Sequence, residues 1–147
     1  MLAIGKDGAV AGTDANSLPT VLIADDEHHI RFMLEWKLKS HDVNILTAAD
    51  GRSALSLAQK HLPALIISDY QMPYLDGVGL VKSLAEDPQT ADIPVILLTA
   101  LEHRLVRADL AETSVEHILR KPFRPSELLE LAADYLQAYR DRQGKAA

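Results

Sequence analysis

The 147-residue sequence contains no cysteine, and that absence removes several classes of site at once. Disulfide bonds, thiolate metal sites and cysteine nucleophiles are all excluded. The sequence also lacks an apolar run of the roughly 18 residues that would cross a bilayer. Its first residues do not contain the long apolar region of a signal peptide. We therefore expect a cytoplasmic protein with no membrane partner.

Positive charge is scarce as well. Lys and Arg number 15 against 21 Asp and Glu, which gives a formal net charge of −6. Nucleic-acid binding needs a basic stripe, and anionic membranes attract basic surfaces, so this balance argues against both kinds of partner. The 48% hydrophobic content is ordinary, and a domain of this length buries about 70% of its unfolded surface. We expect a single domain with a substantial core.

The composition divides the chain into three parts. Residues 1–19 are rich in Gly, Ala, Asp, Asn and Ser and predict a flexible N-terminal leader. Residues 20–142 hold the alternating apolar patterns of a folded domain. Residues 143–147 predict a fraying C-terminal tail.

Within the folded part, short β-branched runs alternate with longer segments of helical periodicity. Five strands that alternate with helices predict a parallel sheet covered by helices on both faces, with right-handed crossovers. The predicted strands are 20–25, 43–48, 64–69, 93–100 and 115–120, and the predicted helices are 27–41, 50–62, 76–87, 102–112 and 124–142.

Polar side chains follow four of these strands, at the edge of an α/β sheet where ligands bind. They are Asp25 and Asp26, Asp69, Thr99, and Lys121. Clustered carboxylates repel one another, and a hard divalent cation such as Mg²⁺ removes that repulsion because it prefers oxygen ligands. An ammonium and a hydroxyl suit the oxygens of a phosphoryl group. One carboxylate could also attack phosphorus and form an acyl phosphate.

The four motifs that carry these residues resemble those of a known family. They are "ADDE" after the first strand, "SDYQMPYLDG" after the third, "LLTA" after the fourth and "RKPF" after the fifth. Together they resemble the receiver domain of two-component response regulators, in its stand-alone form, over residues 20 to about 137. The resemblance implies a flavodoxin-like (βα)5 fold, doubly wound, with a five-stranded parallel sheet of order 2-1-3-4-5.

The resemblance also implies a metal site. In the family pattern Asp26 would bind Mg²⁺ directly, Asp25 would act mainly through water, and Asp69 would share the ion. The backbone carbonyl of Gln71 would supply a further ligand. The cofactor expected from the resemblance is therefore Mg²⁺.

The same resemblance implies a role for each remaining residue. Asp69 would accept a phosphoryl group from a histidine kinase or a histidine phosphotransfer protein. Thr99 would bond a phosphoryl oxygen and shift on phosphorylation, and Lys121 would pair with the phosphoryl group. The peptide bond between Lys121 and Pro122 is expected to be cis. Such a protein would be a monomer or weak dimer that signals through protein–protein contacts.

Two positions depart from the family pattern. Ile118 stands three residues before Lys121, where the family usually has an aromatic residue that turns inward on activation. An aromatic switch is thereby excluded. Leu101 stands two residues after Thr99 on the route of the attacking water, and we expect its apolar side chain to slow self-hydrolysis.

Alternatives to a phospho-accepting receiver remain open from the sequence. The chain could be a pseudo-receiver that is not phosphorylated, or a receiver fragment of a larger regulator or hybrid kinase. An aspartyl phosphohydrolase would need a second Asp where Gln71 stands, so we expect no enzyme activity beyond self-catalysed transfer to Asp69 and hydrolysis from it. His28 and His29 suggest a transition-metal site, but adjacent residues do not share a helix face.

Two aromatic residues fall outside the apolar stripe of the first predicted helix. The stripe consists of Ile30, Met33, Leu34 and Leu38, whereas Phe32 and Trp36 lie off it. One interpretation is that the leader or a long side chain covers Phe32 and Trp36. The other is that they form a docking patch for a kinase or phosphotransfer domain.

Overall fold

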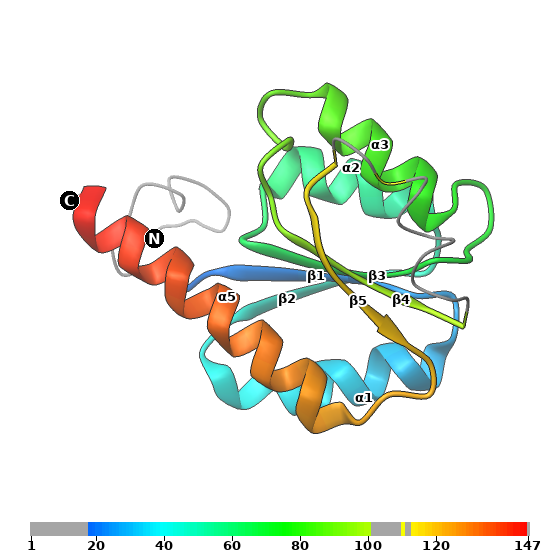
Figure 1. Ribbon diagram of the computed structural model, residues 1–147, viewed down its shortest axis with the longest axis horizontal. Helices are drawn as coiled ribbons and strands as arrows, with labels where there is room; N and C mark the ends of the chain where they lie inside the picture. The colour runs from blue at the N-terminus through cyan, green and yellow to red at the C-terminus, as the bar shows by residue number, and fades with distance from the viewer. Residues whose placement is uncertain (1–17, 101–109, 111–112, 147) are drawn as a thin grey trace, which may run out of the picture.

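The computed structural model describes residues 18–100, 110 and 113–146. A five-stranded parallel sheet forms the middle layer, with strand order β2-β1-β3-β4-β5 (Figure 1). This order confirms the doubly wound arrangement expected from the sequence. The strands are β1 (Thr20–Ala24), β2 (Asn44–Ala48), β3 (Leu65–Asp69), β4 (Val95–Thr99) and β5 (Val115–Arg120).

Helices cover the sheet on both faces. The helices α1 and α5 lie on one face, and α2 and α3 lie on the other (Figure 1). The bounds are α1 (His28–Leu38), followed by the 3-10 turn η2 (Lys39–His41), then α2 (Gly51–His61), α3 (Gly77–Glu86) and α5 (Pro125–Ala146). None of the helices in the described part of the chain is long and apolar enough to cross a membrane.

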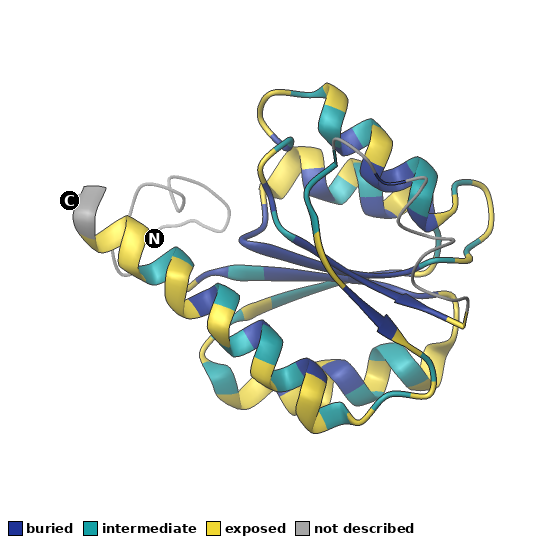
Figure 2. Ribbon diagram, viewed as in Figure 1, coloured by how far each residue is buried: buried dark blue, intermediate teal, exposed yellow. Residues whose placement is uncertain are grey.

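The core consists of two clusters, one on each face of the sheet. Side chains alternate between the faces along a strand, so Val21 and Ile23 pack toward α1 and α5, whereas Leu22 and Ala24 pack toward α2 and α3. Every residue of β3 and β4 is buried (Figure 2). Continuous apolar runs are the pattern of strands covered on both faces, and the polar residues at their ends are therefore exceptions that require a cause.

The helical stripes predicted from the sequence face the core. In α1, Leu34 and Leu38 are fully buried, and Ile30 and Met33 pack against the same cluster. In α5, three residues at four-residue spacing are buried, namely Leu128, Ala132 and Leu136. Phe32 and Trp36 point outward, with 59% and 65% of their surface exposed.

Several boundaries differ from the predicted ones. Helix α5 continues to Ala146, so most of the segment predicted as a tail at 143–147 is helical. The helix predicted at 27–41 ends at Leu38 and continues as a 3-10 turn, after which Asp42 adopts a left-handed φ of 54°. Strand β4 begins at Val95, immediately after the proline, which lacks an N–H group. Leu101, nearly all of the helix predicted at 102–112 and most of the leader lie outside the described residues.

A glycine at the start of α2 allows close packing against the loop that follows β3. Asp50 caps the helix by accepting a hydrogen bond from the N–H of Ser53 at 2.8 Å. A Cβ atom on Gly51 would lie 1.8 Å from the carbonyl oxygen of Leu75. Because this contact is with backbone, it cannot be relieved by a side-chain rotation. Gly51 therefore fixes the position of the loop between β3 and α3.

We expect Gly51→Ala to lower the free energy of unfolding by about 1–3 kcal/mol, the usual cost of overpacking. Gly144→Ala is the matched control, because a Cβ there meets nothing within 4 Å. In that exposed helical position alanine should raise stability by up to about 1 kcal/mol. Urea denaturation measures both changes. Effects of the same sign in the two variants would contradict the role assigned to the contact between Gly51 and Leu75.

Candidate functional site

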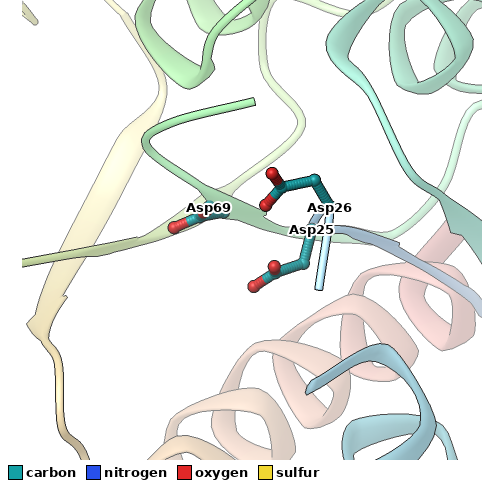
Figure 3. A group of neighbouring side chains, drawn as sticks. All are labelled: Asp25, Asp26 and Asp69. Atoms are coloured by element: carbon teal, nitrogen blue, oxygen red, sulfur yellow. The ribbon is translucent and has the colours of Figure 1, made fainter. Parts of the chain in front are cut away.

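Four of the predicted site residues meet at the carboxyl edge of the sheet. Asp25 follows β1 directly, Asp69 ends β3, Thr99 ends β4, and Lys121 follows β5. Since β1 and β3 are neighbours in the sheet, their terminal carboxylates lie side by side. Figure 3 shows the side chains of Asp25, Asp26 and Asp69 gathered at this edge.

The three carboxylates form a compact group. One oxygen from each of Asp25, Asp26 and Asp69 lies within 4.8 Å of the others. Asp25 is 0% exposed and Asp69 is 7% exposed, whereas Asp26 is exposed to solvent. The site is thus closed on the side of the sheet and open on the side of Asp26, so an ion or a small group can approach from solvent.

Lys121 is the cation that partly neutralises this group. Its Nζ lies 2.9 Å from Oδ1 of Asp69, 3.5 Å from Oδ2 of Asp25 and 3.5 Å from Oε1 of Glu27. Its own N–H donates to the carbonyl of Thr99 at 2.7 Å, which ties the loop after β5 to the end of β4. The Lys121–Pro122 peptide bond is cis, as expected.

Asp25 is held, at its backbone carbonyl and at its side chain, by two residues that sequence reasoning did not assign to the site. The guanidinium of Arg31 donates to the carbonyl oxygen of Asp25 at 2.7 Å, and the N–H of Glu27 donates to Oδ1 of Asp25 at 2.9 Å. Glu27 also contacts Lys121. Its signal in the sequence was its position directly after the acidic pair. Arg31 gave no separate signal, because its contact depends on how α1 starts.

The negative charge of the site is only partly balanced by the positive charge around it. Oδ2 of Asp25 is buried and has no hydrogen-bond partner among the described residues. Burial raises the pKa of Asp25, although the N–H of Glu27 and the ammonium of Lys121 act in the opposite direction. Burial likewise raises the pKa of Asp69 against the hydrogen bond from Lys121.

The pKa of Lys121 is raised as well. Burial alone would lower it, but the hydrogen bond to Asp69 and the charge of Asp25 outweigh that effect. The ammonium therefore stays charged at neutral pH, and it still leaves Oδ2 of Asp25 without a hydrogen bond among the described residues. A buried carboxylate oxygen without a hydrogen bond, beside two further carboxylates, fits a hard cation with oxygen preference, so the residues present are suited to Mg²⁺.

The remaining candidates lie near the site without joining the acidic group. Gln71 occupies an exposed position in the loop after β3. Nδ1 of His28 lies 3.4 Å from Arg31, and Nε2 of His29 lies 3.8 Å from Glu27. Neither imidazole belongs to the metal-ligating group found among the described residues. Ile118 is buried in the core between the sheet and the α2–α3 layer.

Comparisons with known proteins agree with this geometry. The family model described as the response regulator receiver domain matches residues 21–133. The chain is 43% identical over 108 residues to the probable transcriptional regulator ycf27 of Galdieria sulphuraria, covering 74% of this chain and 41% of that protein. It is 41% identical over 108 residues to histidine kinase P4 of Formosa agariphila, covering 74% of this chain and 8% of that protein. The chain spans less than half the length of these two relatives.

A solved structure shows the same likeness over the whole of a smaller protein. The chemotaxis response regulator CheY4 of Vibrio cholerae is 33% identical and superposes with a TM-score of 0.74. The match covers 80% of this chain and 98% of that one. The receiver domain of a Francisella response regulator gives a TM-score of 0.74 at 32% identity, with 82% and 98% of the two chains covered.

Asp25→Asn should raise the stability of the metal-free protein at neutral pH. A neutral amide costs less to bury than a carboxylate with one oxygen that lacks a hydrogen bond, so we expect a gain of about 1 kcal/mol or more in the free energy of unfolding. The variant retains the oxygen that accepts from Glu27. Chemical denaturation in EDTA measures the change, and Asp26→Asn, at an exposed position of the same cluster, is the control. An equal gain in both variants would show that burial is not the cause.

The free energy of unfolding measured in this experiment should also depend on pH, in a direction that the raised pKa values fix. A carboxyl whose pKa is raised by folding binds more protons in the native state than in the unfolded state. The wild-type protein should therefore lose stability as the pH rises from the ordinary carboxyl pKa through the raised values of Asp25 and Asp69. Asp25→Asn should lose less over that interval. A steeper loss in the variant would contradict the assignment.

Proposed function

The chain belongs to the response regulator receiver family, and from this we propose that it is a phospho-accepting receiver in two-component signal transduction, with Asp69 as the acceptor. The observation that carries the proposal is a buried carboxylate that contacts a cation and has two further acids beside it. Nζ of Lys121 lies 2.9 Å from Oδ1 of Asp69, and an oxygen of Asp69 lies within 4.8 Å of oxygens of Asp25 and Asp26. This arrangement supports transfer of a phosphoryl group onto Asp69.

The chemistry of the transfer follows from these neighbours. A carboxylate oxygen of Asp69 attacks phosphorus of a phosphohistidine, the phosphorus–nitrogen bond breaks, and the imidazole leaves with the bonding electrons and takes up a proton. The product is an acyl phosphate on Asp69. The ammonium of Lys121 then pairs with a phosphoryl oxygen instead of the carboxylate. The Thr99 hydroxyl, at the end of the neighbouring strand, bonds another and shifts as it does so.

Mg²⁺ is the proposed cofactor. The residues that would hold it are Asp26 and Asp69 directly, Asp25 through water, and Gln71 through its backbone carbonyl. When bound, the ion supplies positive charge that offsets repulsion between the carboxylates and the incoming phosphoryl oxygens. Oδ2 of Asp25, which has no hydrogen-bond partner among the described residues, supports this assignment, because a buried acidic oxygen without a hydrogen bond is costly.

The proposed phosphodonor is a histidine kinase or a histidine phosphotransfer protein. The exposed rings of Phe32 and Trp36 lie one turn apart on α1, the helix that begins beside the acidic site. Large exposed aromatic residues are typical of interaction surfaces, and their position would place a docked donor close to Asp69. We propose a protein that acts in the cytoplasm as a monomer or weak dimer, without enzyme activity beyond transfer and self-hydrolysis.

A second proposal concerns the context of the chain. The curated relatives are longer than this sequence, which covers 8% of the histidine kinase and 41% of the transcriptional regulator. The receiver could therefore be the signalling portion of a larger regulator or of a hybrid kinase. Both contexts use the same site. They differ in which partner binds the phosphorylated receiver.

The central test is the intact mass of the protein after incubation with acetyl phosphate. We expect a gain of one phosphoryl group that requires Mg²⁺ and is lost in Asp69→Asn, because the amide is not a nucleophile for phosphorus. Asp92→Asn is the matched control, since Asp92 is an exposed residue distant in the fold from the acidic cluster. That variant should be phosphorylated like the wild type.

Absence of an adduct, with Mg²⁺ binding demonstrated separately, would favour a pseudo-receiver that serves as an interaction module. A phosphate-release assay then separates that result from rapid hydrolysis. Release of phosphate in the wild type but not in Asp69→Asn would show that the acyl phosphate forms and decays quickly.

Mg²⁺ affinity should fall as the pH is lowered. The ligands must be deprotonated to bind the ion, and burial raises the pKa of both Asp25 and Asp69. Over the interval in which these groups take up protons, affinity should fall by up to about tenfold per pH unit for each proton displaced. Isothermal titration calorimetry between neutral and mildly acidic pH measures this trend. An affinity that does not change with pH would rule out these carboxylates as the ligands.

A further inference from the structure

The turn between β1 and α1, which carries the acidic pair, is held differently from the other turns at this edge of the sheet. The pairing of β1 with both β2 and β3 ends at Ala24, so Asp25 and Asp26 follow the last paired residue. Helices α2 and α3 each begin after an aspartate whose side chain accepts a backbone N–H. In the described part of the chain, Glu27 forms no such side-chain cap on α1. The conformation of this turn therefore depends on other contacts.

Arg31 supplies the first of these contacts. Its Nη1 donates to the carbonyl oxygen of Asp25 at 2.7 Å, and its Nη2 lies 3.4 Å from Nδ1 of His28. The accepting oxygen belongs to the peptide unit that joins Asp25 to Asp26. Because a peptide unit is planar, a charge-assisted hydrogen bond to its oxygen restrains the orientation of the whole unit. The contact thereby restrains the direction in which the side chain of Asp26 leaves the backbone.

The two acids of the pair differ in how their side chains are held. Oδ1 of Asp25 accepts the N–H of Glu27 at 2.9 Å. Among the described residues, none forms a hydrogen bond or an ion pair with the carboxylate of Asp26, which is exposed to solvent. An oxygen of Asp26 nevertheless lies within 4.8 Å of oxygens of Asp25 and Asp69. The backbone of the turn is therefore what keeps Asp26 in the acidic group.

We propose that Arg31 is a positioning residue for the Mg²⁺ site. The inference rests on the proposed function, in which Asp26 and Asp69 hold the ion directly. Arg31 acts through the peptide unit after Asp25 and keeps the carboxylate of Asp26 beside the other two acids before an ion arrives. A ligand that is already in place loses less conformational freedom on binding, so the affinity for the ion is higher.

A purely structural role for Arg31 leads to a different result. In that case its removal would lower the free energy of unfolding and leave the Mg²⁺ affinity of the folded protein unchanged. Two variants separate these roles. Arg31→Met keeps a long aliphatic side chain and removes every donor. Arg31→Lys keeps the charge and one donor group, but lacks the planar fork that reaches both the carbonyl of Asp25 and His28.

Isothermal titration calorimetry with Mg²⁺ at neutral pH measures the affinity of each variant. We expect Arg31→Met to bind the ion about 10- to 100-fold more weakly than the wild type, the usual effect of losing a residue that orients metal ligands. Arg31→Lys should recover part of that loss. Arg142→Met is the matched control, because it removes the same charge from an exposed position near the end of α5. It should bind Mg²⁺ like the wild type.

Hydrogen exchange in EDTA tests the same contact without a metal ion. The N–H of Glu27 donates to Asp25 within the turn, and it should lose protection in Arg31→Met because the turn is no longer held. The N–H of Gly79 is the internal control. It donates to Oδ1 of Asp76 at 2.8 Å in the cap of α3, and its protection should be the same in both proteins.

Equal Mg²⁺ affinity in the wild type and Arg31→Met would overturn the inference and leave the receiver function intact. An equal loss of affinity in Arg142→Met would overturn it too, because net charge would then be the cause. A wild type that binds no Mg²⁺ would overturn the proposed cofactor and this inference together. Urea denaturation shows whether each variant is folded. If Arg31→Met is unfolded, Arg31→Lys takes its place, and an affinity equal to that of the wild type would again count against the role of the guanidinium.

Discussion

The ion pair between Lys121 and Asp69 is the interaction on which the arrangement of the strand ends depends. Three strands of the sheet deliver acids or a hydroxyl to one edge, and Lys121 reaches them from the end of a fourth. The strand order 2-1-3-4-5 makes β1 and β3 neighbours and so forces Asp25 and Asp69 together. Without a cation, two buried carboxylates at this distance would hold a proton between them.

The ammonium cannot satisfy the whole cluster. Its contacts at 2.9 Å and 3.5 Å still leave Oδ2 of Asp25 without a hydrogen bond, and the pKa values of both aspartates remain raised. The fold therefore holds an excess of negative charge at this edge of the sheet, which costs stability that the rest of the packing must offset. The backbone is packed closely beside the site, as at Gly77, where a Cβ would lie 2.5 Å from the carbonyl oxygen of Asp69.

The sequence predicted the sheet and most of the site because both depend on strand ends. A buried parallel strand is a continuous apolar run, so the residue that ends it stands out, as Asp69 does. Glu27 and Arg31 were not assigned because their contacts depend on the path by which α1 leaves β1. The predicted helix at 124–142 was too short, because it ended before Gly144 and glycine often ends helices. Arg140 donates to the carbonyls of His41 and Asp42 at 3.0 Å and 3.2 Å, an anchor between distant segments that local periodicity does not reveal.

That anchor gives the α1–α5 layer a mechanical property. Helix α5 has 22 residues and is about 33 Å long, whereas a five-residue strand of the sheet spans only about 17 Å. The helix starts close to Lys121 and is fastened by Arg140, some 15 residues later, to the turn that ends α1. Any displacement of the far half of α5 would therefore be transmitted through Arg140 to the turn that ends α1.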